Sequence, residues 1–267
     1  MRQKIISRIS FCLAVIFAVL ALFDTQNKKA AEREYESLQS EYTASTGSDE
    51  REKEQSSSTD SGMQEFPQFD VDTAELQKLN SDFCMWLIYP DAGISLPIVH
   101  ESSDRIDYYL NHTISGQKSP VGCLFISSSE SADITSGNTV IHGHNMRDGS
   151  MFGGLKNIVN DPKTYCTNPY FFLFDKSGRK MKFRVFAVYT VDKSSSMYVS
   201  PETQNEYENY IQKAINLGGT ENIVPFTDSE KRAVKNQKPL VTLSTCYGIE
   251  GTSKRTLVQG ILIQTES

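Results

Sequence analysis

Cys246 is the residue most suited to chemistry, since it ends an alternating run of side chains and Arg255 follows it nine residues later. Apolar and polar residues alternate over 240–246, which is typical of a half-buried strand, and Gly248 and Gly251 interrupt the pattern directly afterwards. We therefore expect the thiol at the rim of a sheet. Taken by itself, however, a free cysteine is most often a small buried hydrophobe.

A second segment, 138–146, also predicts a strand that ends in histidine, and it carries both His142 and His144. A thiol is a strong nucleophile only as the thiolate, and a nearby imidazole can hold or supply the proton. The two segments together predict a cysteine–histidine pair for acyl transfer. Side chains two residues apart on a strand point to the same face, so alternation alone does not choose between the two histidines.

The motifs around these residues resemble those of the sortases, the cysteine transpeptidases of Gram-positive surfaces. Thr-Leu-Ser-Thr-Cys at 242–246 is similar to the TLxTC strand end of that family, which has a Gly-His upstream and an arginine downstream. The block 143–155, with Gly-His-Asn-Met, Met-Phe and a final leucine, resembles the more specific signature of class B sortases. The resemblance extends over roughly residues 73 to 265.

This resemblance implies that His144, Cys246 and Arg255 are the catalytic residues, without a cofactor or a metal. Cys246 would attack the carbonyl of a Thr-Gly type bond in the C-terminal sorting motif of a secreted protein, which gives a thioacyl enzyme. His144 would protonate the departing amine and then act as general base towards a peptidoglycan precursor amine. Arg255 would hold the substrate or the developing oxyanion. His142, one pleat deeper, is expected to be a structural histidine.

The rest of the chain must supply the strands that position these residues. Strands are predicted over 85–89, 94–99, 122–126, 139–144, 170–174, 182–191, 240–246 and 256–264. Helices are predicted over 73–83, 151–159, 202–217 and 229–234. Many short strands with few helices favour a closed barrel over alternating β-α units. The predicted fold class is mainly β with short helices (α+β), and the resemblance implies an eight-stranded sortase-type β-barrel preceded by an N-terminal membrane helix.

Residues 1–25 are interpreted as a membrane-targeting segment. Three basic residues at positions 2, 4 and 8 precede an apolar run over 9–23 that only Ser10 interrupts. The uninterrupted part suits a signal peptide, whereas counting from position 5 reaches the length of about 17 to 25 residues that a span requires. We favour an uncleaved anchor, because the small-residue cleavage site at 19–21 lies inside the run. The basic cluster predicts a single-pass protein of the cell membrane, with a cytoplasmic N-terminus and an extracellular catalytic domain.

Residues 26–70 are expected to form a polar extracytoplasmic linker, because almost no aliphatic residue follows Leu38 and such a composition cannot form a core alone. A solvated helix is expected over 30–42 and a flexible spacer over 47–62. The catalytic domain then occupies 71–267, which is enough chain for one compact core.

Composition limits the classes of partner that this chain can bind. A net charge of −6 and a pI near 5.3 argue against a nucleic-acid partner, which requires a basic face. The expected partners are sorting-signal-bearing secreted proteins, a peptidoglycan precursor amine and the membrane.

One disulfide among Cys84, Cys123 and Cys166 is allowed outside the cell, although buried free thiols are favoured. Two of these cysteines, Cys84 and Cys123, stand where the family has small or polar residues, and the loop 247–254 matches no family pattern.

Two alternatives remain open at this level. A secreted cysteine protease or hydrolase would use the same cysteine and histidine but pass the acyl group to water; papain-like motifs are absent from the sequence. A non-catalytic adhesion or scaffold domain would have no reason to keep the cysteine, histidine and arginine together.

Overall fold

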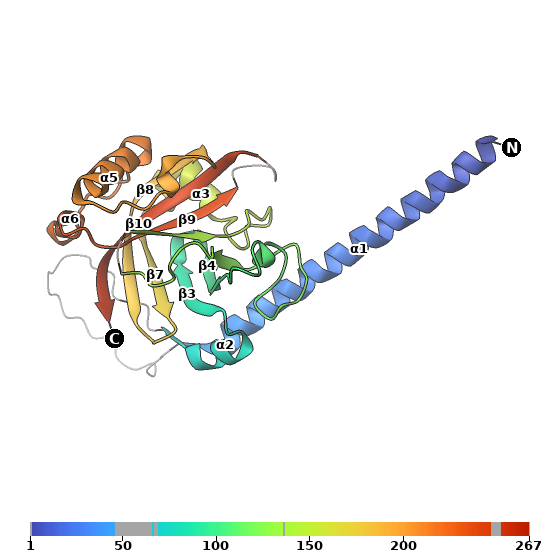
Figure 1. Cartoon of the computed structure of the whole chain (residues 1–267), viewed down its shortest axis with the longest axis horizontal. Coiled ribbons are helices and arrows are strands. Elements are labelled where there is room, and N and C mark those ends of the chain that lie inside the picture. Colours follow the sequence, from blue (N-terminus) through green and yellow to red (C-terminus); the bar gives the residue numbers. More distant parts are fainter. Residues whose placement is uncertain (1, 46–65, 67–68, 136, 247–251, 267) are drawn as a thin grey trace, which may run out of the picture.

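The computed structural model describes residues 2–45, 66, 69–135, 137–246 and 252–266. Within these residues the main body is a closed barrel (Figure 1). Its strand order is β10-β8-β7-β3-β4-β5-β6-β9. Its strands are β3 (Phe83–Tyr89), β4 (Ile94–His100), β5 (Leu124–Ile126), β6 (Asn138–His142), β7 (Tyr170–Asp175), β8 (Lys180–Asp192), β9 (Leu240–Cys246) and β10 (Lys254–Glu266). The predicted eight-stranded barrel is confirmed.

Strand direction decides where the chain can place a site. Neighbouring strands of the barrel are antiparallel except for β4 with β5 and β6 with β9, which are parallel. Parallel strands end at the same edge of a sheet. The carboxyl ends of β6 and β9, which carry His142 and Cys246, therefore meet at one rim of the barrel.

Strand formation follows from apolar side chains on both faces. Every residue of β3 is buried, and Trp86 at its centre is fully inaccessible. Phe171 and Phe183 stack with ring centroids 5.0 Å apart. One set of side chains fills the barrel, and the other is covered by helices and loops, so the strands lack the simple alternation of a one-sided sheet.

Short helices and turns connect the strands and cover the barrel. They are α2 (Thr73–Leu79), η1 (Pro90–Ala92), η2 (Tyr108–Leu110), α3 (Leu155–Asn160), α4 (Pro162–Tyr165), η3 (Ser196–Tyr198), α5 (Gln204–Gly218) and α6 (Asp228–Lys235). Both α5 and α6 lie in the long connection from β8 to β9, and each begins with a capping box, Thr203 with Glu206 and Thr227 with Glu230. The buried face of α5 packs with residues of β8, β9 and β10 in a second apolar cluster. This cluster fixes the connection onto the barrel.

The N-terminal helix α1 (Arg2–Tyr42) is continuous and projects away from the barrel (Figure 1). Its outer part exposes large apolar side chains such as Phe11 and Phe17, which are 70% and 68% exposed. Within the described part of the chain, the segment Ser10–Tyr42 is the one helix long and apolar enough to cross a membrane. The helix continues past residue 25, the expected end of the membrane segment.

The C-terminal half of α1 differs from the solvated helix expected over 30–42. Ala31, Tyr35 and Leu38 are buried against the domain, and the Tyr35 hydroxyl donates to the Gly122 carbonyl at 2.5 Å. Their spacing of four and three residues forms an apolar stripe that the barrel covers. Beyond the helix, β1 (Thr43–Ser45) pairs with β2 (Phe69–Val71). The expected spacer over 47–62 lies outside the described residues.

Several predicted boundaries are wrong, including the following three. The strand predicted over 139–144 ends at His142. The helix predicted over 73–83 ends at Leu79, because extended backbone begins at the next residue and Phe83 already belongs to β3. The helix predicted over 151–159 begins at Leu155, because Met151 has a φ of 51°, which a right-handed helix does not accommodate.

Candidate active site

Cys246 is the last residue of β9, which lies between β6 and β10. Antiparallel pairing with β10 places Cys246 opposite Arg255, and parallel pairing with β6 places Ser244 beside His142. Both Cys246 and Arg255 are half-buried, whereas Thr245, the residue before Cys246 in β9, is buried. The register therefore brings the thiol and the guanidinium-bearing residue to neighbouring strand ends at the rim.

His144 lies just beyond the end of β6, and its position depends on Gly143. The Gly143 N–H donates to the Ser244 carbonyl at 3.1 Å, and the Gly143 carbonyl accepts from Thr245 Oγ1 at 2.7 Å. A Cβ at position 143 would lie 2.4 Å from Leu124 Cδ2, so a larger residue would displace this tight turn. Glycine thus leaves room for the side chains of Leu124 and Phe152 beside the turn that carries His144 to the rim.

The imidazole of His144 is oriented by the loop that precedes β5. Its Nε2 lies 2.6 Å from the carbonyl oxygen of Leu110, the last residue of η2. Because a carbonyl oxygen only accepts, Nε2 carries the hydrogen. In the neutral ring, Nδ1 is then the nitrogen that can accept a proton.

A cavity of about 380 Å³ opens at this rim, and its lining contains His144, Cys246 and Arg255. The three residues come from the turn after β6, the end of β9 and the start of β10. The structure thus brings all three predicted residues to one cavity. Other residues of its lining, from the loop before β5 and from η3, are Ile106, Leu110 and Tyr198.

The guanidinium of Arg255 is held by the main chain at the start of β10. Its Nη1 donates to the carbonyls of Thr252 and Lys254, at 2.6 and 3.0 Å. These bonds restrict the planar group, whose other N–H donors are arranged in a fixed fork. Arg255 also affects the cavity at a distance, because its positive charge lowers the pKa of His142.

His142 lines the same cavity but has a different environment from His144. Its ring stacks on Phe125 with centroids 5.3 Å apart and faces Tyr198 at 6.5 Å with nearly parallel planes. Burial, followed by the charge of Arg255, lowers the pKa of His142 to about 4. The ring is therefore neutral at physiological pH and packed between aromatic groups. Because β6 ends at His142, the expectation that both histidines lie on one strand face is wrong.

Two side chains at the rim were not identified from the sequence. Asn145 Nδ2 donates to the Cys246 carbonyl at 2.8 Å, which connects the histidine turn to the cysteine strand. The Tyr198 hydroxyl and Ser244 Oγ lie 2.8 Å apart. Asn145 stands inside the Gly-His-Asn-Met motif, which could have indicated it. Nothing in the sequence around Tyr198 connects it with a residue 46 positions later.

The three other cysteines of the barrel domain are absent from the lining of this cavity. Cys84, Cys123 and Cys166 are buried and free, so no disulfide joins them in this structure. Burial raises the pKa of Cys123 to about 12 and that of Cys166 to about 11, and it raises the pKa of Cys84 as well. These thiols therefore stay protonated at neutral pH, which makes them poor nucleophiles.

Comparisons with known proteins agree with this fold and site. The Sortase domain family model matches residues 87–263. Sortase B of Listeria monocytogenes is 32% identical over 193 residues, which cover 71% of this chain and 73% of that protein. A crystal structure of Clostridium perfringens sortase B is similar with a TM-score of 0.60 and 25% identity, and covers 72% of this chain and 99% of its own.

The solved structure of sortase B from Listeria monocytogenes is also similar, with a TM-score of 0.56 and 30% identity over 71% of this chain and 99% of that chain. The family match spans more than half of the sequence and includes both segments that converge at the rim. The chain belongs to the sortase family, and its similarity to class B members identifies it as a cysteine transpeptidase.

Proposed function

We propose that this transpeptidase cleaves a Thr-Gly type bond in the C-terminal sorting motif of secreted proteins and joins the new carboxyl end to an amine of the cell wall. The observation that supports the proposal is the single cavity lined by Cys246, His144 and Arg255. A thiol, an imidazole and a fixed cation meet the three needs of acyl transfer, which are a nucleophile, a proton carrier and a group that stabilises negative charge.

In the first step the Cys246 thiolate attacks the carbonyl carbon of the scissile bond. A carbon–sulfur bond forms, the carbon–nitrogen bond breaks, and the departing amine takes a proton from protonated His144. The product is a thioacyl enzyme with His144 neutral. The bond from Nε2 of His144 to the Leu110 carbonyl leaves Nδ1 as the nitrogen that gives the proton.

In the second step an amine attacks the thioacyl carbon. A carbon–nitrogen bond forms, the carbon–sulfur bond breaks, Cys246 leaves as thiolate, and His144 accepts the proton of the incoming amine. One amide is exchanged for another, so no oxidant, reductant or cofactor takes part. If water attacked instead, the same residues would produce a free acid.

Arg255 stabilises the negative charge that develops on the substrate oxygen in both steps. The Nη1 bonds to two main-chain carbonyls orient the guanidinium before substrate arrives. A preoriented cation loses little free energy to reorganisation during the reaction. An arginine side chain is not deprotonated in proteins, so Arg255 stays charged while the cysteine and histidine exchange protons.

We further propose that α1 is an uncleaved anchor, with the N-terminus in the cytoplasm and the barrel outside. The exposed apolar surface of its outer part and the basic residues before it favour this topology. A reporter fused to the C-terminus should then be accessible from outside and stay in the membrane after alkaline washing. Recovery of a soluble chain that begins near residue 22 would show that the segment is a cleaved signal peptide.

The activity is tested by incubating the full chain in detergent with a library of sorting-motif peptides, with and without primary amines. We expect a thioacyl adduct on Cys246, and an amide product that increases with amine concentration at the expense of the acid. Acid as the sole product at every concentration of glycine, lysine and diaminopimelate amines would favour a hydrolase.

A further inference from the structure

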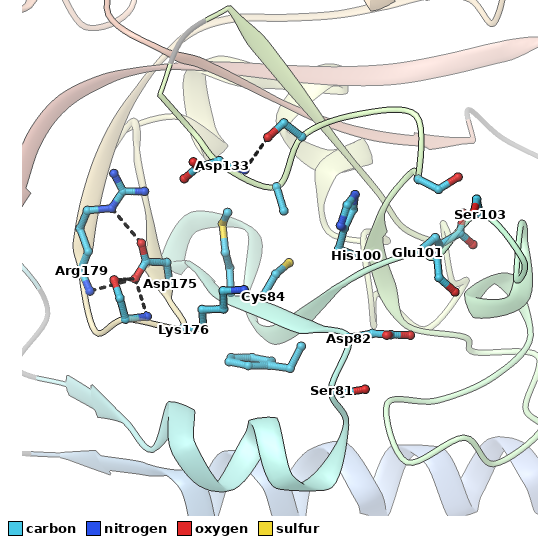
Figure 2. Close-up of a pocket in the computed structure, with 17 residues that line it drawn as sticks. Ser81, Asp82, Cys84, His100, Glu101, Ser103, Asp133, Asp175, Lys176 and Arg179 are labelled. Atoms are coloured by element: carbon cyan, nitrogen blue, oxygen red, sulfur yellow. Dashed lines mark hydrogen bonds and ion pairs between the residues drawn. The ribbon is translucent and has the colours of Figure 1, made fainter.

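A second and larger cavity lies next to the catalytic one. It measures about 780 Å³ and is formed by the start of β3, the end of β4, the loop after β5 and the turn between β7 and β8. Figure 2 shows Asp175, Lys176 and Arg179 at one end of it and Glu101 at the other. Glu101 lines both this cavity and the one that contains Cys246. The carboxylate therefore stands at the junction of the two.

Glu101 is unusual because it is a buried carboxylate with an unused acceptor. Its side chain is 2% exposed, and among the described residues no donor lies within hydrogen-bond distance of its Oε1. Burial, and then the charge of Asp107, raise the pKa of this carboxyl, while the backbone amides of residues 107 to 109 oppose the rise. The carboxylate is thus oriented by main-chain groups, and a cation opposite Oε1 would offset the cost of its burial.

Two of the three other acids that line this cavity already have partners, and the third, Asp133, is exposed. Asp82 accepts from the Arg105 guanidinium at 2.6 Å and from the Tyr109 hydroxyl at 2.7 Å. Asp175 accepts from Arg179 Nε at 2.8 Å. A cationic ligand would therefore bind at Glu101 rather than at either of these aspartates, because it would not have to displace an existing ion pair.

We propose that the larger cavity binds the amine acceptor, with the protonated amine held by Glu101 at the junction with the catalytic cavity, where it gives one proton to solvent before it attacks as the neutral amine. This inference rests on the proposed function, whose second step consumes an amine next to Cys246. The other end of the cavity supplies positive charge from Lys176, which suits a carboxylate of the same ligand, whereas Arg179 is paired with Asp175. The ligand class is a short amino-terminated peptide or amino acid with a free carboxylate.

The same ammonium chemistry could come from a basic side chain of the sorting peptide. The acceptor is favoured because the cavity has charge of both signs and several serine hydroxyls, which matches a small zwitterion, and because the acceptor must approach the thioacyl carbon from beside the cysteine. The two sources are separated by measuring peptide hydrolysis without amine and transfer with amine.

The test uses the full chain in detergent, a cleavable sorting peptide, and triglycine or its C-terminal amide as the amine. Glu101→Gln should raise the KM for both amines by about ten-fold, because a hydrogen bond to a charged group is lost. This change should exceed any change in the hydrolysis rate. Glu130→Gln is the matched control, since Glu130 is a half-buried glutamate that lines neither cavity and accepts from the Val140 N–H.

Lys176→Gln should raise the KM for triglycine but leave that for the amide within two-fold, because only triglycine has a carboxylate. An unchanged KM in Glu101→Gln, or a loss confined to hydrolysis of peptides with a basic residue, would overturn the proposal. If Glu101→Gln does not fold, Glu101→Asp decides, since withdrawing the carboxylate should also raise the KM for the amine and an unchanged KM contradicts the proposal.

Direct binding separates this inference from the proposed function. Triglycine should bind Cys246→Ala in calorimetry, and more weakly when Glu101→Gln is added. If no amine is ever acylated but this difference in binding is seen, the proposed acyl transfer is contradicted and the proposed amine site is supported. If transfer occurs and neither binding nor KM depends on Glu101, the amine site is wrong while transfer stands.

Discussion

Cys246 and His144 at the rim of the barrel can be compared with Cys166 and His142, which have the same side chains in more enclosed surroundings. Cys246 is the last residue of β9, and His144 lies two residues beyond the end of β6; both line the cavity at the rim, as does His142. Cys166 is fully buried, and burial raises its thiol pKa to about 11, while the ring of His142 is packed and its pKa is lowered to about 4. Residue type alone therefore does not make a nucleophile or a base; access and the surrounding charges do.

The largest effect is expected from the two cysteines. Cys246→Ala should reduce turnover of sorting peptides by at least about a thousand-fold with little change in melting temperature, because it removes the nucleophile from a half-exposed strand end. Cys166→Ala should retain activity and lose roughly 1 kcal/mol of stability, because it leaves a small void in the core. Turnover and thermal unfolding of both variants check this, and near wild-type cleavage by Cys246→Ala would remove it as the nucleophile.

For the two histidines as well, the larger loss of activity is expected from the residue at the rim. His144→Ala is expected to abolish thioacyl transfer, because no other group at the rim is proposed to carry the proton. His142→Ala should cost stability, since it empties the space between Phe125 and Tyr198, and reduce the rate only modestly. If His142→Ala is inactive and His144→Ala is active, the catalytic histidine named here is wrong.

Substitutions of Arg255 test whether a positive charge alone is enough to stabilise the negative charge that develops on the substrate. Arg255→Lys should lose about ten- to a hundred-fold in kcat/KM, because a point charge cannot reproduce the planar fork, and Arg255→Ala should lose more. Initial rates with one peptide over a range of concentrations give both numbers. Wild-type rates in both variants would make Arg255 an ordinary surface residue.

A smaller effect is expected at Asn145, whose side chain connects the histidine turn to the carbonyl of Cys246. Asn145→Ala should lower kcat by about three- to ten-fold with little change in KM, because the distance between nucleophile and base becomes less restricted. Asn145→Gln reaches further with the same amide and should recover part of the rate. Equal losses in kcat and in stability for both variants would indicate a structural role only.

The smallest effect concerns the pH dependence of stability. The pKa of His142 is about 4 in the folded chain against an ordinary value of 6.5, so the unfolded chain binds more protons between these values. The contribution of His142 is fully present above pH 6.5 and is lost as the pH falls towards 4. Between pH 7 and pH 4 the free energy of unfolding should therefore fall by about 1 to 3 kcal/mol more in the wild type than in His142→Phe. Urea titrations of both proteins at each pH measure this fall. If the histidine were not buried, the free energy of unfolding would change with pH by the same amount in both.

Much of the fold was predictable because the strands have strong local patterns. The strand over 240–246 was predicted with its correct bounds, since it alternates and stops at glycine-rich sequence. The end of β6 was not, because His142 to His144 continues an extended pattern while the close approach of Gly143 to Leu124 is a tertiary contact. The packing of α1 was missed for a similar reason, since the barrel surface that covers Tyr35 is formed by residues far along the chain.

The sequence by itself determined the chemical components, namely a cysteine, a histidine and an arginine in motifs that belong to one family, on elements whose periodicity indicates a barrel. Local propensities and short motifs carry that information, because they depend on neighbours along the chain. Only the tertiary structure decided which histidine is packed between aromatic rings, that Asn145 and Tyr198 contact the cysteine strand, and that Glu101 lines two cavities. These properties depend on burial and on contacts between distant segments, which exist only after the barrel has closed.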